Sequence, residues 1–186
     1  MTRQNLAAQV EDESAGARPK QTRALPVTLV VAVIAVVLDQ GSKALAAAQL
    51  APGDRIPLLG DLFGLSLVYN PGAAFSLGSG ATWIFTLVGA LAAGSVVTFA
   101  ARLRGARWSL ALGLVLGGAA GNLADRLWNP PAFARGNVTD FLAYGDLVIG
   151  NIADVFVVLG VVLICLNLLR SGPHQATNNE QTGDAS

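Results

Sequence analysis

The sequence contains a single cysteine and a single histidine, and this scarcity excludes several kinds of site. Cys165 lies within an apolar segment, so the chain has neither a disulfide framework nor a cysteine-rich metal site. His174 lies in a polar C-terminal segment, which argues against Ser-His-Asp and Cys-His catalysis. A metal site with two histidines is impossible, and we expect neither a metal nor an organic cofactor.

Charged residues are also scarce, making up 13% of the 186 residues, against about 25% in a typical globular chain. The net charge is zero, which argues against a nucleic acid partner. Residues 62–101 contain no Asp, Glu, Lys or Arg, whereas about 20 apolar residues suffice to cross a bilayer. The composition therefore predicts an integral membrane protein.

The apolar segments predict an all-α membrane protein with four transmembrane helices. Eight of the twelve basic residues lie before the first segment, between the second and third, or after the fourth. Because Lys and Arg concentrate on the cytoplasmic side, both termini are expected there, with two loops outside. The predicted transmembrane helices are residues 25–48, 81–101, 108–127 and 147–169.

We expect one membrane domain, residues 24–170, flanked by two polar segments. Residues 1–23 and 171–186 are rich in Gln, Asn, Ala, Gly and acidic residues, which predicts disordered cytoplasmic tails. Residues 46–48 are small, as at the end of a secretory leader, but the charged residues just before them make a cleaved leader the weaker alternative.

The first outer loop carries a period-two pattern, in which Phe63, Leu65, Leu67 and Tyr69 alternate with smaller or differently facing residues. Such alternation is typical of a half-buried strand. We therefore predict a small extracytoplasmic β-cradle between the first and second helices. An irregular loop is the alternative.

Every acidic residue within the membrane domain is an aspartate, and charges near membrane depth are usually functional because burying them is unfavourable. Asp54 and Asp61 belong to a loop and are expected to be solvated. Asp39 and Lys43 are spaced i, i+4, which favours a structural ion pair. Asp154 has no cation within a helical turn of it, so another helix or loop must supply its partner.

Two similar tetrapeptides, Asn-Leu-Ala-Asp and Asn-Ile-Ala-Asp, end at Asp125 and Asp154 in the third and fourth predicted helices. In each, the Asn and the Asp lie i, i+3 on one helix face, and both faces reach the outer half of the membrane. The pattern predicts that Asp125 and Asp154 meet. Hydrogen bonds that merely tie the helices together and a local Asp125–Arg126 ion pair are the alternatives.

Two carboxyl groups held close together would provide a hydrolytic mechanism. They cannot both ionise, so one keeps its proton while the other takes a proton from water, and the protonated group donates to the carbonyl oxygen. Asp140, in the second outer loop, is either solvated or folds onto the entrance of the fourth helix. A Ser42-Lys43 dyad is a weaker rival, because adjacent helical residues point about 100° apart.

Five short segments, together with the four predicted helices, resemble the lipoprotein signal peptidases (signal peptidase II), which are bacterial membrane aspartyl proteases. Each segment alone is weakly specific, but five in this order are very specific. The resemblance extends over residues 25–169. The segments are DQGSK at 39–43, NPGAAFS at 70–76, GGAAGNLADR at 117–126, VTDF at 138–141 and NIAD at 151–154.

The resemblance implies that Asp140 and Asp154 form the catalytic pair, in place of the pairing suggested by the two tetrapeptides. It also implies that Asp39 and Lys43 form a supporting pair. The residues implied to shape the substrate site or to contact substrate are Asn70, Gly72, Asn122, Asp125, Arg126 and Asn151.

The resemblance further implies an intramembrane endopeptidase of the bacterial cytoplasmic membrane. Such an enzyme removes the signal peptide of prolipoproteins, cutting before a cysteine that already carries diacylglycerol. The implied partners are these lipidated substrates and membrane lipid, with no nucleic acid. We expect a monomer with its active site near the outer face, blocked by the antibiotic globomycin.

Two departures from the family pattern put the outer-loop geometry in question. Asp140 and Asp154 are only 14 residues apart, and residues 147–150 replace the aromatic-Pro element usual before the last segment. Two other classes of protein remain as alternatives. One is a small transporter or proton channel using the buried aspartates, and the other is a non-catalytic scaffold held together by Asn and small residues.

Overall fold

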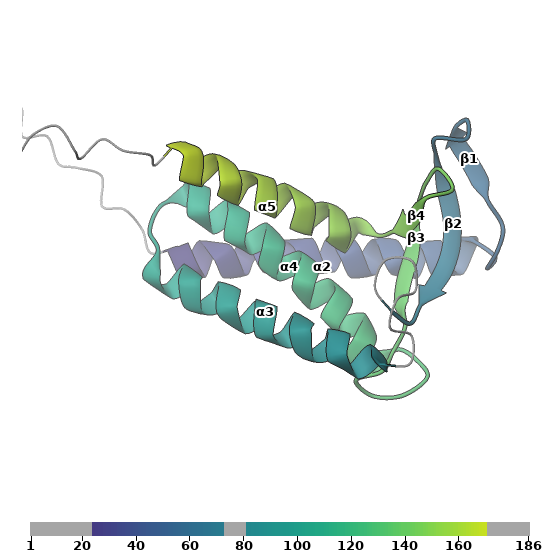
Figure 1. Ribbon diagram of the computed structural model, residues 1–186, viewed down its shortest axis with the longest axis horizontal. Helices are drawn as coiled ribbons and strands as arrows, with labels where there is room; N and C mark the ends of the chain where they lie inside the picture. Colours follow the sequence, from purple (N-terminus) through teal and green to yellow (C-terminus); the bar gives the residue numbers. More distant parts are fainter. Residues whose placement is uncertain (1–23, 73–80, 171–186) are drawn as a thin grey trace, which may run out of the picture.

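The computed structural model describes residues 24–72 and 81–170, in which long helices form a bundle and a small sheet covers one end (Figure 1). The predicted tails, 1–23 and 171–186, lie outside the described residues, as does the part of the 70–76 segment after Gly72. The helices of the bundle are α2 (Ala24–Gln49), α3 (Thr82–Arg102), α4 (Ala106–Trp128) and α5 (Ile152–Arg170).

Three of these helices, α2, α3 and α5, are long and apolar enough to cross a membrane. Their outward faces expose large apolar side chains such as Val37 and Leu91, which an aqueous surface would not favour. Helix α4 is rich in Gly and Ala and packs against the other three, so it is the most buried and does not need lipid-facing apolar residues. The chain is therefore a mostly helical membrane protein.

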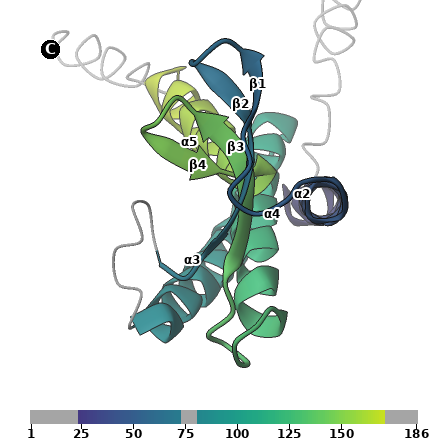
Figure 2. The ribbon, with the colours of Figure 1, turned by 90° about the vertical axis from the view of Figure 1, so that its right-hand side faces the viewer.

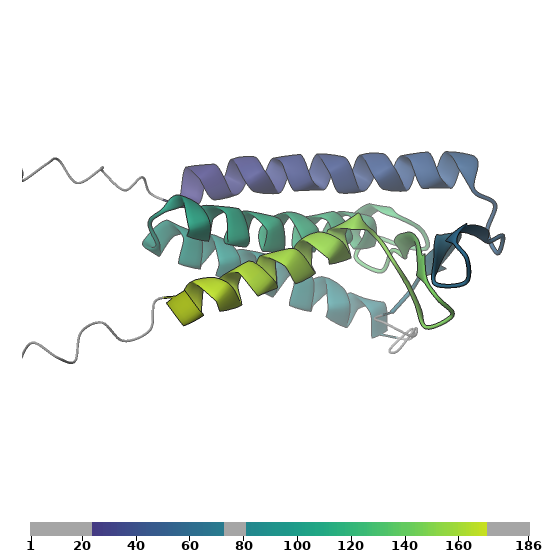
Figure 3. The same ribbon diagram turned by 90° about the horizontal axis from the view of Figure 1, so that it is seen from above.

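Close approach of the helices depends on glycines of α4, as the small residues around position 120 predict. A Cβ atom at Gly117 would collide with Ala35 and the carbonyl of Ala32 on α2. A Cβ atom at Gly118 would collide with the carbonyl of Ala153 on α5. Helix α2 consequently runs alongside α4, while α5 crosses the bundle at an angle to α2 (Figure 3).

The sheet contains four antiparallel strands in the order β1-β2-β3-β4 and lies across the end of the bundle (Figure 2). The predicted strand in the first outer loop is confirmed, shifted by one residue. The expectation that the sheet comes only from the connection between the first two helices is wrong, because β3 and β4 come from the connection between α4 and α5. The strands are β1 (Ile56–Leu59), β2 (Phe63–Asn70), β3 (Val138–Tyr144) and β4 (Val148–Gly150).

Strand β3 escaped prediction because six of its seven residues are buried, so no alternation marks it in the sequence. The fourth predicted helix, residues 147–169, also began too early. Its first residues pair with β3 as β4, after a turn at Gly145, whose φ of 59° suits glycine. Short apolar runs are compatible with either strand or helix, and here the strand prevails. As a result Asp154 lies in the first turn of α5 rather than two turns inside it.

Candidate active site

Asp140 and Asp154 line one cavity of about 310 Å³ at the sheet end of the bundle. Strand β3 carries Asp140 and the first turn of α5 carries Asp154. The side chains face the cavity differently: Asp140 is 3% exposed, whereas Asp154 is exposed. The other predicted site residues that line this cavity are Asn70, Gly72, Asn122, Arg126 and Asn151.

Asn151 and Asp154 form a reciprocal cap at the start of α5. The backbone N–H of Asp154 donates to Oδ1 of Asn151 at 3.1 Å, and the backbone N–H of Asn151 donates to Oδ2 of Asp154 at 3.1 Å. This is the capping-box arrangement, in which two helix-terminal N–H groups are satisfied by two side chains three residues apart. The Asn-x-x-Asp spacing therefore starts the helix and fixes the Asp154 carboxyl group.

Asp140 is held by two amide groups, one on each carboxyl oxygen. Nδ2 of Asn151 donates to Oδ1 at 2.6 Å, and Nδ2 of Asn70 donates to Oδ2 at 3.0 Å. Asn70 is itself oriented by the backbone N–H of Gly72, which donates to its Oδ1. Asp140 is thus a buried strand residue and not a solvated loop residue, because pairing of β3 with β2 brings it beside Asn70.

Burial raises the pKa of Asp140 from 3.8 to about 6. Hydrogen bonds from Asn70 and Asn151 oppose this shift, because they stabilise the charged carboxylate. The negative charge of Asp154 raises the pKa further, and the positive charge of Lys43 lowers it. Asp140 therefore titrates close to neutral pH and responds to the charge of Asp154, as expected of two carboxyl groups sharing a site.

Asn122 is a hydrogen-bond partner of Asp154, for which the sequence alone identified no partner. Its Nδ2 on α4 donates to Oδ1 of Asp154 on α5 at 2.8 Å. Asn151 serves both aspartates, so amide groups from three elements surround the two carboxyl groups. These bonds connect α4 and β3 to the start of α5, and they also orient the two carboxyl groups.

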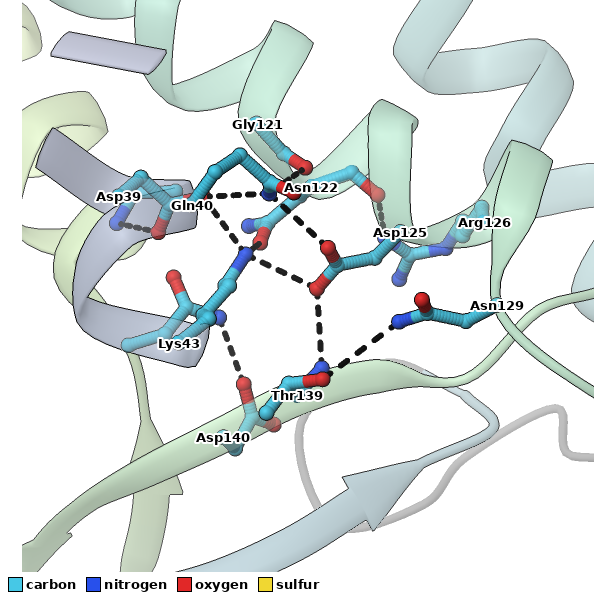
Figure 4. A network of polar contacts seen from close by, with 12 residues as sticks. Asp39, Gln40, Lys43, Gly121, Asn122, Asp125, Arg126, Asn129, Thr139 and Asp140 are labelled. Atoms are coloured by element: carbon cyan, nitrogen blue, oxygen red, sulfur yellow. Dashed lines mark hydrogen bonds and ion pairs between the residues drawn. The ribbon is translucent and has the colours of Figure 1, made fainter. Parts of the chain in front are cut away.

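A second group of charged residues lies buried between α2 and α4 (Figure 4). Nζ of Lys43 lies 2.8 Å from Oδ2 of Asp39 and 3.0 Å from Oδ2 of Asp125. The three side chains are at most 4% exposed. The predicted Asp39–Lys43 ion pair is confirmed, and Asp125 joins it. We call Asp39, Lys43 and Asp125 the lysine cluster.

The lysine cluster touches both chain segments that carry the cavity aspartates. The backbone N–H of Ala153, beside Asp154, donates to Oδ1 of Asp39 at 2.9 Å. The backbone N–H of Thr139, beside Asp140, donates to Oδ2 of Asp125 at 2.9 Å. The ammonium group also donates to Oδ1 of Asn122 at 3.0 Å. One buried cation therefore sets the position of β3, the start of α5 and the amide that binds Asp154.

Asp125 does not line the cavity of Asp140 and Asp154. Successive strand residues point to opposite faces, so Thr139 and Asp140 face two different cavities. Asp125 and Thr139 line a larger cavity of about 570 Å³, together with Lys43. The pairing of Asp125 with Asp154 expected from the two tetrapeptides is therefore not what the structure brings together.

Arg126 lies at the cavity without forming the local ion pair with Asp125. Its guanidinium donates to the carbonyls of Asn122 at 3.2 Å and Gly72 at 3.1 Å, and it lies 5.8 Å from the ring centre of Phe85. Its Nε is buried and has no hydrogen-bond partner within the described residues. Its positive charge is close enough to interact with both cavity aspartates.

Two further residues of the cavity carried no signal in the sequence. Tyr144 ends β3, and burial together with the charge of Asp154 raises the pKa of its hydroxyl, so it remains protonated at neutral pH. A Cβ atom at Gly150 would lie 2.9 Å from Oδ2 of Asp154, so the carboxyl group needs glycine there. Across the described residues no group of three or more His, Cys, Asp or Glu side chains is arranged to hold a metal ion.

Known proteins with similar sequences belong to one family. A family model described as signal peptidase (SPase) II matches residues 31–170. The lipoprotein signal peptidase of Leifsonia xyli subsp. xyli is 45% identical over 159 residues, covering 83% of this chain and 74% of that protein. The lipoprotein signal peptidase of Rhodococcus jostii is 41% identical over 161 residues, covering 83% and 79%.

Solved structures are similar as well. A bacterial membrane enzyme structure superposes with a TM-score of 0.71 and 26% identity, covering 89% of this chain and 98% of that chain. A second bacterial membrane enzyme structure gives a TM-score of 0.68, also at 26% identity, and covers 81% and 97%. With a family model that matches most of its length, the chain belongs to the signal peptidase II family.

Proposed function

We propose that this protein is an aspartyl endopeptidase that removes the signal peptide from diacylglyceryl-modified prolipoproteins, with Asp140 and Asp154 as its catalytic pair. The family supports peptidase action on prolipoproteins. The observation that carries the assignment of the pair is the shared cavity, where both carboxyl groups are held by amides and neither forms an ion pair within the described residues.

The pair activates water without a covalent intermediate. The ionised carboxylate takes a proton from water as the oxygen attacks the scissile carbonyl, and the protonated carboxyl group gives its proton to the carbonyl oxygen. When the tetrahedral intermediate collapses, the carbon–nitrogen bond breaks and the first carboxyl group protonates the leaving nitrogen. The second carboxyl group recovers its proton from the intermediate. Because the two groups interact, the pair titrates as a unit.

The remaining cavity residues bind substrate in this proposal. Asn70, Gly72, Asn122 and Asn151 keep the two carboxyl groups in place and offer polar groups to an extended peptide backbone. Arg126 brings a positive charge beside both aspartates and an Nε–H that has no partner in the described part of the chain, which suits contact with a peptide carbonyl. Asp125 acts through its ion pair and shapes the site from behind β3.

The same arrangement supports a particular placement in the membrane. Residues 24–170 form one four-helix peptidase domain in which α4 crosses the bilayer, shielded by the three apolar helices. The sheet then rests on the outer surface of the cytoplasmic membrane, and both termini are cytoplasmic. This position suits a substrate whose acyl chains stay in the outer leaflet while its cleavage site enters the cavity. The protein acts as a monomer.

Cleavage of a diacylglyceryl-modified prolipoprotein peptide by the purified full-length protein tests the proposal. We expect wild-type cleavage immediately before the lipidated cysteine, inhibition by globomycin, and no cleavage of the unlipidated peptide. Asp140→Asn and Asp154→Asn should each lower kcat at least about 1000-fold. Asp54→Asn, which changes an exposed aspartate outside the cavity, should cleave as the wild type does.

The variants must remain folded for this test to decide. A cooperative thermal transition in detergent would establish that, since each substitution keeps the size of the side chain. A folded Asp140→Asn or Asp154→Asn protein that still turns over substrate refutes the catalytic assignment. A folded Asp125→Asn protein with normal substrate binding but no cleavage would restore the pairing of Asp125 with Asp154.

A further inference from the structure

The end of the bundle away from the sheet contains a basic cavity that the peptidase reaction does not use. It has a volume of about 410 Å³ and is lined by residues from the link between α3 and α4, the start of α4 and the end of α5. These segments lie together at the end of the bundle opposite the sheet (Figure 1). Arg104, Arg107 and Arg170 line it, with Trp108 and Asn167. We call this the arginine cavity.

The positive charge of the arginine cavity has no counterpart among the described residues. None of its three arginines forms an ion pair there. Every described acidic residue belongs to the sheet, its connections or the sheet-facing halves of the helices. Arg102, the last residue of α3, adds another positive charge nearby. Like charges gathered in one cavity are stabilised by a bound anion.

The arginine cavity also lies at the level expected for lipid headgroups. Two membrane-crossing helices, α3 and α5, end beside it, at Arg102 and Arg170. Trp108 is half-buried, and tryptophan is enriched at the boundary between hydrocarbon and water. Exposed apolar side chains, including Phe99 on α3 and Leu169 on α5, continue from this end along the helices. A bound lipid could therefore place its headgroup in the cavity and its chains along these faces.

We propose that the arginine cavity binds the headgroup of an anionic phospholipid. Guanidinium groups bind phosphate oxygens in pairs, and basic pockets between membrane helices suit anionic headgroups. Helix α4 begins at Ala106 beside the cavity, and its N-cap residue Gly105 provides no side-chain cap, so the N–H groups of its first turn add favourable interactions with an anion. The adjoining apolar faces favour a lipid over free phosphate.

Native mass spectrometry of the purified full-length protein in detergent, titrated with phosphatidylglycerol, tests the proposal. We expect one retained lipid per chain, and no comparable retention of phosphatidylcholine. Arg104→Gln/Arg107→Gln should weaken phosphatidylglycerol binding about 30-fold. The matched control, Arg55→Gln/Arg135→Gln, has the same net charge but removes arginines at the sheet end of the bundle, and its affinity should stay within about twofold of the wild type.

Each other outcome overturns the proposal. Equal losses in the two double variants would mean that diffuse charge, and no built site, holds the lipid. Full competition by inorganic phosphate at concentrations similar to those of the lipid would assign the cavity to free phosphate. Unchanged melting in detergent without added lipid controls for folding, and Arg104→Lys/Arg107→Lys should recover part of the binding. Peptide cleavage is not the readout, so failure here leaves the proposed peptidase function untouched.

Discussion

Two pairs of aspartates lie on opposite sides of β3, and they are held in opposite ways. Asp39 and Asp125 share the ammonium group of Lys43 and are almost completely buried. Asp140 and Asp154 receive neutral amide and backbone donors and face a cavity. Within the described residues the first two carboxyl groups are ion-paired and the other two are not, and burial raises the pKa of Asp140 to about 6.

This difference separates a supporting pair from a reacting pair. The carboxylates of the lysine cluster accept hydrogen bonds from the backbone N–H groups of Thr139 and Ala153, the residues next to the cavity aspartates. The lysine cluster therefore helps to position Asp140 and Asp154. Catalytic groups held by such rigid surroundings lose little energy to reorganisation during the reaction. Substitutions in the lysine cluster should therefore mainly lower stability, whereas substitutions around the cavity should mainly change pH dependence and activity.

Lys43→Met should produce the largest loss of stability. It leaves two buried carboxylates without their cation, and removing one partner of a buried pair costs about 3–5 kcal/mol. Denaturation of the protein in detergent measures the loss. Adding Asp125→Asn should restore part of it, because one uncompensated charge disappears. Arg55→Gln, which breaks an exposed ion pair with Asp146, is the control and should change stability by at most about 0.5 kcal/mol. Equal losses of stability in Lys43→Met and Arg55→Gln would show that the buried ion pairs are worth no more than an exposed one.

Asp140→Asn should change how stability depends on pH. Burial raises the pKa of Asp140 from 3.8 to about 6, so its contribution to stability is full below pH 3.8 and is lost as pH rises through 6. Relative to wild type, the variant should gain about 2 kcal/mol between pH 4 and pH 7. Denaturation at both pH values measures this gain. The free energy of unfolding of Asp54→Asn should depend on pH as that of the wild type does. The same dependence in Asp140→Asn would disprove the pKa shift.

Asn151→Ala should lower activity more than stability. Loss of the cap costs about 1 kcal/mol, whereas misplacing both carboxyl groups should reduce kcat about 100-fold. The Asn151 amide lowers the pKa of Asp140, so without it the limb of the kcat/KM profile that Asp140 sets should move to higher pH. Asn137→Ala removes an amide outside the cavity and should leave that limb in place. An unmoved limb in Asn151→Ala would show that the amide does not act on Asp140.

Gly150→Ala should have the smallest effect. Its Cβ would lie 2.9 Å from Oδ2 of Asp154, which the backbone N–H of Asn151 holds in place, so the carboxyl group must shift. We expect kcat to fall about tenfold with KM little changed. Steady-state cleavage measures both constants. The matched control is Gly94→Ala in α3, where the added Cβ has no heavy atom within 4 Å, and it should keep full activity. Similar kcat values for the two variants would argue against close packing at Asp154.

Helix positions were readable from the sequence, with one informative error. The first three predicted helices agree with α2, α3 and α4 within two residues at each end, because long apolar runs have few alternative structures. The start of the fourth was wrong because residues 148–150 pair with β3, and strand pairing depends on a partner that a local pattern cannot reveal.

Candidate residues were readable from residue type and order. Burial of aspartates in an apolar chain singles them out, and the Asn-x-x-Asp spacing places each Asn and Asp on one face. Spacing alone paired Asp125 with Asp154, and the resemblance replaced that pairing with Asp140 and Asp154. Nothing local marked Tyr144, which interacts with the charge of Asp154, or Gly150, which leaves room for its carboxyl group.

By itself the sequence determined a membrane protein, the approximate position of its helices and the small set of polar residues that could react. Hydropathy and residue spacing are local properties, so they can be read from the sequence without knowledge of the fold. Only the tertiary structure decided that Lys43 forms an ion pair with Asp125, while Asp140 and Asp154 line one cavity. Those partners come from distant segments, and the packing of α4 against its neighbours determines which of them meet.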